Sequence, residues 1–160
     1  MTLRGKTVRE SVHETTHLVM PGDANPHGTA FGGQVMAWID LAAAISAVRH
    51  ARESVVTAGI DAVNFVSKIQ LGHLVILKSS VNFTGRCSME IGVRVESEDP
   101  LTGRREHACT AYLTFVAVDG SGQPREVPPV LPETGEERRR HDEARARREH
   151  RLALRKPALP

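Results

Sequence analysis

The spacing of hydrophobic residues divides the chain of 160 residues into one long helix and a series of strands. Residues 32–52 are apolar on nearly every side when they are placed on a helix. A short edge strand over residues 12–20 precedes this helix. After it, apolar and polar residues alternate with a period of two, which predicts strands over residues 54–66, 74–85, 88–97 and 106–119.

The links between the predicted strands are short and carry the glycine and proline residues typical of turns, as in residues 99–104 and 119–124. Short links join antiparallel strands, whereas parallel strands need a long crossover. The sequence also lacks internal repeats and the regular alternation of strands and helices that builds a parallel sheet. We therefore expect an α+β fold in which one helix lies on one antiparallel sheet.

A second helix is predicted near the C-terminus. Residues 126–134 are rich in proline and should run extended, and Thr134 with Glu137 fits a capping box that starts a helix over residues 135–154. Residues 138–156 carry nine Arg or Lys and three Asp or Glu, a local net charge of +6 in a chain with a total of +2. This charge favours an anionic partner, but a solvated, partly frayed extension would have the same pattern.

The amino-acid composition is that of a globular domain without a membrane helix, a disulfide framework or a zinc site. The chain is 40% hydrophobic and 25% charged, as in ordinary globular domains. No apolar run reaches the roughly 18 residues of a membrane helix, and the first residues lack the apolar stretch of a signal peptide. Cys87 and Cys109 form no disulfide framework, and no neighbouring Cys or His suggests a zinc or thiol site. We expect a reduced, cytoplasmic setting and no metal.

The most unusual residue of the predicted long helix is Asp40, which lies too far from the helix start to act as a cap. Gly33, Ala37 and Ala44 share its stripe of the helix, so small side chains leave room there for another backbone or a narrow ligand. A buried carboxylate must shift its pKa or find partners. Asp40 therefore either bonds to a neighbouring strand in a structural role or belongs to a functional site.

The loop before this helix supplies groups that suit hydrolysis of an activated acyl group. Its glycines, Gly28 and Gly32 among them, permit tight turns, and Asn25 offers an acceptor and two donors. The free N–H groups at the helix start near Gly33 can hold a carbonyl oxygen as negative charge develops on it. His27 is a further candidate for a general base, although a loop histidine beside proline is more often solvated or part of a turn.

At these residues the chain resembles the hotdog-fold acyl-CoA thioesterases, and among them the cytosolic long-chain (brain-type) acyl-CoA hydrolases and their single-domain bacterial relatives. The likeness begins with a helix of the form Gly-Gly, five residues, then Ile-Asp, followed by the strand VVTAGIDAVNF. It continues in the same order through DAVNFVSKI, TGRCSMEI, LTGRREHACTAYLTFVAV and VPPVLPETGEERRR. The resemblance therefore covers most of the chain.

The resemblance implies a hotdog domain, a long helix wrapped by an antiparallel sheet, over residues 1–126, with the connector and basic helix in residues 127–160. It implies that two chains pair into a double hotdog, often assembled further as a trimer of dimers. Fatty acyl-CoA would be hydrolysed at the dimer interface to free fatty acid and coenzyme A. Asp40 of one subunit would act as general base or nucleophile, and Asn25 of the other would position water or the carbonyl.

Coenzyme A is part of the substrate and product, so the resemblance implies no cofactor. It places two segments along the coenzyme path, Thr57-Ala58-Gly59-Ile60 and Cys87-Ser88-Met89. Gly59 equally fits a bulge or a bend of the strand. Candidates for binding the coenzyme's phosphates through the planar guanidinium are Arg86, Arg147, Arg148 and Arg151. A merely solvated face is the alternative for each arginine.

Two other functions remain open at this stage. One is a hotdog hydratase or dehydratase that acts on acyl thioesters. The active sites of such enzymes resemble a histidine paired with an acidic residue, and His27 supports that alternative. A non-catalytic acyl-CoA sensor would use the basic helix, with nucleic acid or acidic lipid as the partner. That helix lacks the aromatic residues that stack on single-stranded nucleic acid, and the joint presence of Asn25 and Asp40 favours catalysis.

Overall fold

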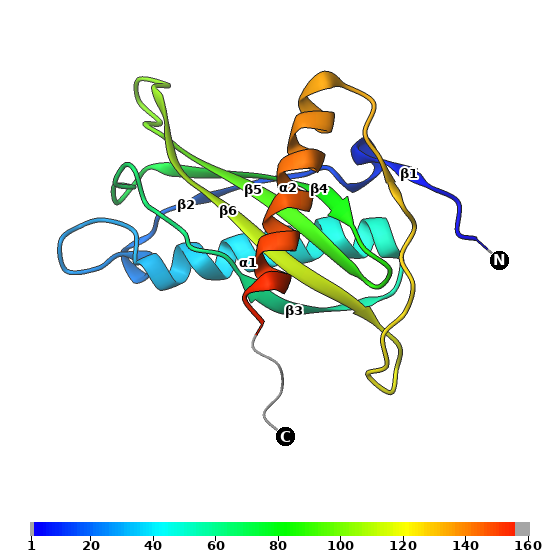
Figure 1. Cartoon of the computed structure of the whole chain (residues 1–160). Helices are drawn as coiled ribbons and strands as arrows, with labels where there is room; N and C mark the ends of the chain where they lie inside the picture. The colour runs from blue at the N-terminus through cyan, green and yellow to red at the C-terminus, as the bar shows by residue number, and fades with distance from the viewer. Residues whose placement is uncertain (1, 156–160) are drawn as a thin grey trace.

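The computed structural model describes residues 2–155, which form a sheet curled around one long helix, with a second helix on the outer face of the sheet (Figure 1). Two short 3-10 turns, Val8–Ser11 and Pro21–Asp23, precede the long helix. The strands and helices are, in chain order, β1 (Lys6–Thr7), β2 (His13–Leu18), α1 (Gly32–Ala51), β3 (Ser54–Ile60), β4 (Leu74–Thr84), β5 (Ser88–Glu98), β6 (Arg105–Val118), β7 (Val130–Leu131) and α2 (Gly135–Ala153).

The main sheet confirms the expected antiparallel α+β architecture. Its strands lie in the order β2-β4-β5-β6-β3, and every neighbouring pair is antiparallel. β2 and β3 are therefore the two edges of the sheet. A separate short parallel pair joins β1 to β7 and ties the connector before α2 to the start of the chain.

The strand predicted over residues 54–66 is shorter than expected. β3 ends at Ile60, opposite Leu113 of β6, and residues 61–66 leave the sheet. Asp61 and Asn64 interrupt the apolar run, and both residue types are poor strand formers. The apolar residues beyond this point belong to a loop.

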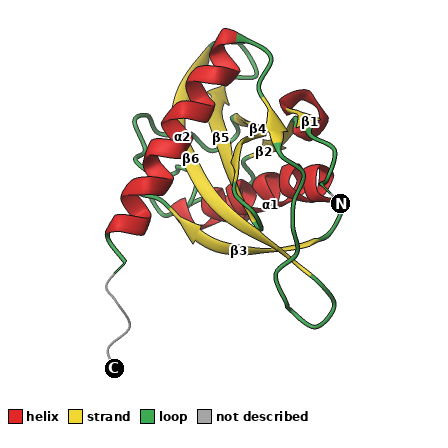
Figure 2. Cartoon of the chain, turned by 45° about the vertical axis from the view of Figure 1, so that its right-hand side comes forward, coloured by secondary structure: helices red, strands yellow, loops and turns green. Residues whose placement is uncertain are grey.

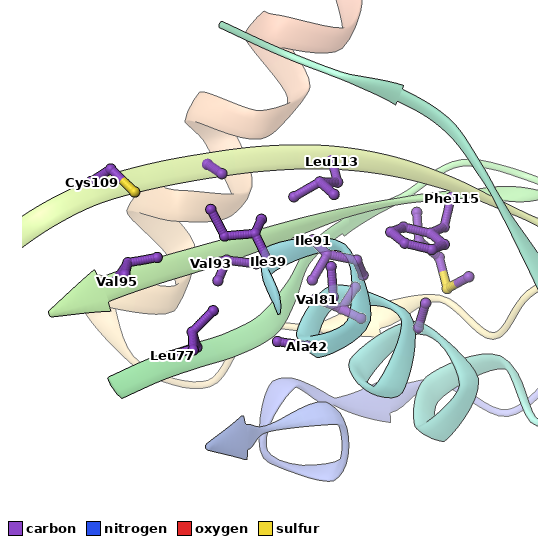
Figure 3. Packing of buried hydrophobic residues seen from close by; sticks show 14 of the residues in the cluster. Ile39, Ala42, Leu77, Val81, Ile91, Val93, Val95, Cys109, Leu113 and Phe115 are labelled. Carbon is purple, nitrogen blue, oxygen red and sulfur yellow. The ribbon is translucent and has the colours of Figure 1, made fainter. Parts of the chain in front are cut away.

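The core lies between α1 and the inner face of the sheet. Ile39 and Ala42 of α1 are at most 1% exposed, and side chains from three strands cover them (Figure 3). The alternation predicted for β5 is confirmed, because all its inward residues are at most 1% exposed: Met89, Ile91, Val93 and Val95. At about 25 cal/mol per Å² of apolar surface, burial of such side chains is the main stabilising term.

The opposite face of α1 is not covered by this chain. Leu41 is 57% exposed and Val48 is 42% exposed, although both are large and apolar. The sheet therefore wraps only one face of a helix that the sequence predicts to be covered on all sides. Strand β3 lies beside this face and is itself largely exposed (Figure 2).

Helix α2 lies across the outer face of the sheet, on the side opposite α1 (Figures 1 and 2). The predicted capping box is present: the Glu137 N–H donates to Thr134 Oγ1, and the Thr134 N–H donates to the Glu137 carboxylate, each at 3.1 Å. Ala144 is fully buried and His141 packs on Phe83 of β4. The alternative of a solvated extension is therefore wrong for residues 135–153.

A buried histidine joins the end of α1 to the connector. The ring Nε2 of His50 lies 2.7 Å from the carbonyl oxygen of Pro128, so Nε2 carries the proton and donates. His50 is fully buried, and its Nδ1 has no hydrogen-bond partner among residues 2–155. Burial lowers the pKa of His50, so the neutral ring is favoured in the folded protein.

We predict that His50 makes the protein less stable in acid. Below its ordinary pKa of about 6.5 the unfolded chain binds a proton that the folded chain excludes, so the free energy of unfolding falls as pH decreases through this value. The slope for one histidine is at most about 1.4 kcal/mol per pH unit. Chemical denaturation between pH 5 and pH 8 should show a smaller slope for His50→Gln, whereas His27→Gln, at an exposed loop position, should keep the wild-type slope. An unchanged slope in His50→Gln would contradict the assignment.

Candidate active site

The carboxylate of Asp40 is held by a hydroxyl from the neighbouring edge strand. Thr57 Oγ1 of β3 donates to Asp40 Oδ1 at 2.8 Å. Asp40 is only half-buried in the single chain, although it lies in the middle of an apolar helix. The reason is that its stripe of α1, with Gly33 and Ala37, lies on the uncovered face of the helix.

Thr57, which the resemblance places along the coenzyme path, has a contact that the sequence does not predict. Its hydroxyl is directed to Asp40. The pairing of β3 with β6 shifts register between Thr57 and Gly59, which is the bulge that the glycine allowed. The signal for this contact is a polar residue two positions before a glycine in an otherwise apolar strand.

Asn25 organises the loop before α1. Its Oδ1 accepts from the N–H groups of His27, at 2.9 Å, and Thr29, at 3.2 Å. Its Nδ2 donates to Thr29 Oγ1 at 2.8 Å. Because an amide nitrogen has two hydrogens, one donor of Asn25 is left after this contact. His27 itself is exposed at the surface of the loop.

The N-terminus of α1 is open for an oxygen ligand. Among the described residues no side chain caps it, since the N-cap position is Phe31. The first N–H groups of an α-helix have no acceptor within the helix, and the helix dipole makes this end positive. A side chain at Gly33 would meet the exposed ring of Phe31 at 2.5 Å, so Phe31 would have to move.

A groove of about 320 Å³ lies between α2 and the ends of β3 and β5. The strands contribute Ala58 and Gly59 on one side, and Ser88 and Met89 on another. A positively charged wall comes from α2 and the residues that follow it, with Arg148, Arg151 and Arg155. The structure thus brings together six of the residues predicted to bind coenzyme A: Ala58, Gly59, Ser88, Met89, Arg148 and Arg151.

The other predicted coenzyme residues lie outside the walls of this groove. Arg86 is exposed and faces Glu126 at 3.7 Å, and Cys87 occupies the neighbouring turn. Ile60 is 40% exposed at the end of β3. Arg147 donates to Glu90 through two nitrogens, at 2.7 and 3.1 Å, a partner that the sequence does not predict.

The arginines of the groove differ in their partners. Arg151 Nη1 lies 2.9 Å from Asp61 Oδ2 and 3.5 Å from Glu90 Oε2. Within residues 2–155 neither Arg148 nor Arg155 forms an ion pair, so both remain available for an anion. Arg155 was missed because it lies beyond the predicted helix end, where no pattern relates it to the sheet.

A second, apolar hollow of about 430 Å³ lies beside the start of α1. Gly32 and Val35 of the helix form one side of it. The other side is the loop after β3, with Phe65, Val66 and Ile69. The start of α1 therefore combines an apolar hollow with free N–H groups, and Asp40 lies on the same helix, seven residues after Gly33.

Other chemistries find less support in the described part of the chain. Residues 2–155 contain no group of three His, Cys, Asp or Glu that could hold a metal ion. Burial raises the pKa of the Cys109 thiol to about 11, so it stays protonated and is a poor nucleophile at neutral pH. In the same residues no helix has both the length and the apolar character to cross a membrane.

Comparison with known sequences agrees with this geometry. Residues 27–103 match the model of the thioesterase superfamily. A Bacillus subtilis protein named uncharacterized acyl-CoA thioester hydrolase YkhA is 47% identical over 136 residues, which cover 85% of this chain and 79% of that protein. The mouse cytosolic acyl coenzyme A thioester hydrolase is 38% identical over 144 residues, 88% of this chain but only 38% of the longer mouse protein.

Solved structures extend the likeness to three dimensions. A crystal structure of an apo-hexameric acyl-CoA thioesterase superposes with a TM-score of 0.91 at 47% identity, covering 96% of this chain and all of that one. The Staphylococcus aureus acyl-CoA hydrolase, solved with butyryl coenzyme A and coenzyme A, gives 0.87 at 40% identity over 92% and 90% of the two chains. With these relatives matched along most of its length, the chain belongs to the thioesterase superfamily, among the hotdog-fold acyl-CoA thioester hydrolases.

Proposed function

We propose that this chain hydrolyses fatty acyl-CoA to free fatty acid and coenzyme A, at sites shared between two copies of the chain. The observation that carries the proposal is the pair of Asp40 and Thr57 on an apolar face that one chain leaves uncovered. Two relatives, from B. subtilis and mouse, are named as acyl-CoA thioester hydrolases. The mouse relative is named cytosolic, and we place this chain in the cytoplasm as well.

The uncovered face supports pairing of two chains. Leu41 and Val48 of α1 and Val56 of β3 are 42–57% exposed, and the free edge of β3 offers unpaired backbone groups to another strand. Contiguous apolar patches of this kind mark interaction sites. A second copy would cover α1 and extend the sheet through β3, which encloses Asp40. The hexameric relative supports further assembly, for which we propose a trimer of dimers.

In this arrangement Asp40 acts on the thioester. As a general base it takes a proton from water, whose oxygen forms a bond with the carbonyl carbon; as a nucleophile it would form that bond itself. The carbonyl oxygen, which gains negative charge, is held by the N–H groups near Gly33 and by the amide of Asn25 from the other subunit. The C–S bond then breaks, and the coenzyme thiolate leaves and gains a proton. On the nucleophilic route the acyl group stays on Asp40 as a mixed anhydride, which a water molecule then hydrolyses to free fatty acid and the Asp40 carboxylate. The Thr57 hydroxyl keeps the carboxylate in position.

Variants of the S. aureus enzyme support this choice of residues. Solved structures of that enzyme include alanine variants of an asparagine, an aspartate and a threonine. These three residues follow one another at intervals of 15 and 17 residues, the intervals that separate Asn25, Asp40 and Thr57. We infer that the three positions correspond and that all of them belong to the site.

Coenzyme A would lie in the groove along α2. Gly59 and Ala58 leave space for the narrow pantetheine arm, since nothing lies within 4 Å of where a Gly59 side chain would begin. Arg148 and Arg155 would bind the phosphates, because they line the groove without ion-pair partners among the described residues. The acyl chain would occupy the apolar hollow beside the start of α1.

Replacing Asp40 by Asn tests the central residue. The amide keeps the shape and can still accept from Thr57, but it has no charge and cannot act as base or nucleophile. We expect kcat/KM for thiol release from acyl-CoA to fall at least ~100-fold, with little change in melting temperature. Asp142→Asn, which removes an exposed carboxylate from α2, should keep wild-type activity. Near-normal turnover by folded Asp40→Asn protein would exclude the proposed role.

Mixing two inactive variants tests whether the site is shared. Asn25→Ala and Asp40→Asn homodimers should each be inactive. In a random mixture half of the dimers are mixed, and each mixed dimer has one intact site, so activity should return to about one quarter of wild type. Native mass spectrometry would verify subunit exchange. If exchange occurs and activity stays absent, both residues act within one chain or elsewhere.

The groove arginines should affect binding of the nucleotide part of the substrate. We expect Arg148→Gln/Arg155→Gln to raise KM for acyl-CoA about tenfold or more, because charge-assisted hydrogen bonds contribute about 1.5–3 kcal/mol each. The effect should shrink at high salt. The matched control, Arg138→Gln/Arg145→Gln, removes the same charge from α2 outside the groove. An equal change in KM for both double variants, or for an acyl-pantetheine without nucleotide, would contradict the assignment.

A further inference from the structure

Glu90 is a buried carboxylate that the proposed reaction does not use. It lies on β5 with its side chain 2% exposed, while its neighbours Met89 and Ile91 point into the core on the other face of the sheet. Glu90 therefore faces α2, on the outer side of the sheet. An ionised carboxylate at such a position is stable only when it is paired and hydrogen-bonded.

Three side chains satisfy the Glu90 carboxylate. Arg147 donates from Nη2 to Oε1 at 2.7 Å and from Nε to Oε2 at 3.1 Å, a bidentate pair. Asn82 Nδ2 donates to Oε1 at 3.3 Å, and Arg151 Nη1 lies 3.5 Å from Oε2. A side chain at Gly92 would meet Asn82 at 2.7 Å, so the glycine lets Asn82 lie here.

The same contacts fix the position of α2. Arg147 also lies over the ring of Tyr112, with its guanidinium carbon 3.6 Å from the ring centre. Arg151, four residues later, contacts Asp61 at the end of β3 as well as Glu90. Among the described residues of α2 only Ala144 is buried, so this helix is held by charged groups and not by an apolar stripe.

The walls of the coenzyme groove meet near Glu90. Ala58 and Gly59 belong to the strand that ends beside Asp61, and Ser88 and Met89 precede Glu90 on β5. The third wall is α2 with the residues that follow it, which present Arg148 and Arg155. Arg147 and Arg151 join the same helix to the sheet.

We propose that Glu90 is a positioning residue for coenzyme recognition, which fixes α2 on the sheet through Arg147 and Arg151 and thereby aligns Arg148 and Arg155 with the phosphates. Glu90 does not contact the reacting thioester; it acts through the helix. This inference rests on the proposed function for its substrate, but the anchoring of α2 does not depend on activity.

The test is Glu90→Gln in the full chain, which removes the charge and nearly preserves the shape. We expect KM for acyl-CoA to rise about tenfold with kcat within about twofold, and KM for the matching acyl-pantetheine to stay unchanged. Amide hydrogen exchange should accelerate in α2 but not in α1. The control Glu96→Gln alters a carboxylate of the same strand that pairs with Lys78 and Arg94, and it should leave both properties unchanged.

A second variant separates positioning from general damage to the fold. Arg147→Gln should raise KM for acyl-CoA as Glu90→Gln does, and the double variant should raise it no further, because both single changes break one pair. Unchanged protection of α2 in Glu90→Gln, or an equal rise of KM for both substrates, would overturn the inference. Absence of thiol release by the wild-type protein would overturn the proposed function instead, while the exchange measurement would still decide whether Glu90 anchors α2.

Discussion

Helix α1 is apolar on nearly every side, and such a helix is stable in water only if all of its faces are covered. The curled sheet covers one face, with Ile39 and Ala42 in the core, and leaves Leu41 and Val48 exposed. Strand β3 adds an open sheet edge beside the same face. Pairing with a second copy would satisfy both requirements at once, and it would enclose Asp40 in the contact. In the proposed function, assembly and catalysis therefore depend on the same surface.

Helix α2 is held by a different kind of force. Its contacts with the sheet centre on the buried Glu90 and the arginines that pair with it. Loss of one partner of a buried ion pair typically costs about 3–5 kcal/mol, since a charge is left without a partner. The two faces of the sheet thus carry helices of opposite character, one apolar and one charged. The groove that we propose for coenzyme A lies on the charged side, where an anionic ligand would add to an existing set of arginines.

The sequence predicted the parts of this structure that follow from local patterns. Period-two alternation placed β4, β5 and β6 within one residue at each end, and the capping box at Thr134 placed the start of α2. Asp40 was found because a charge in an apolar helix breaks the pattern. The contacts of Thr57 and Arg147 were not predicted, since each pairs with a residue distant in sequence on another element. Spacing along one segment contains no information about such partners.

The products formed from acyl-CoA test the account most directly. Purified wild-type protein would be given acyl-CoA substrates from short to long chain, and free thiol and free fatty acid would both be measured. The account predicts that thiol and fatty acid appear in equal amounts for at least one chain length. A change in the absorbance of an enoyl thioester without release of thiol would identify a hydratase. Binding of acyl-CoA with no product at any chain length would identify a sensor, and either result would contradict the account.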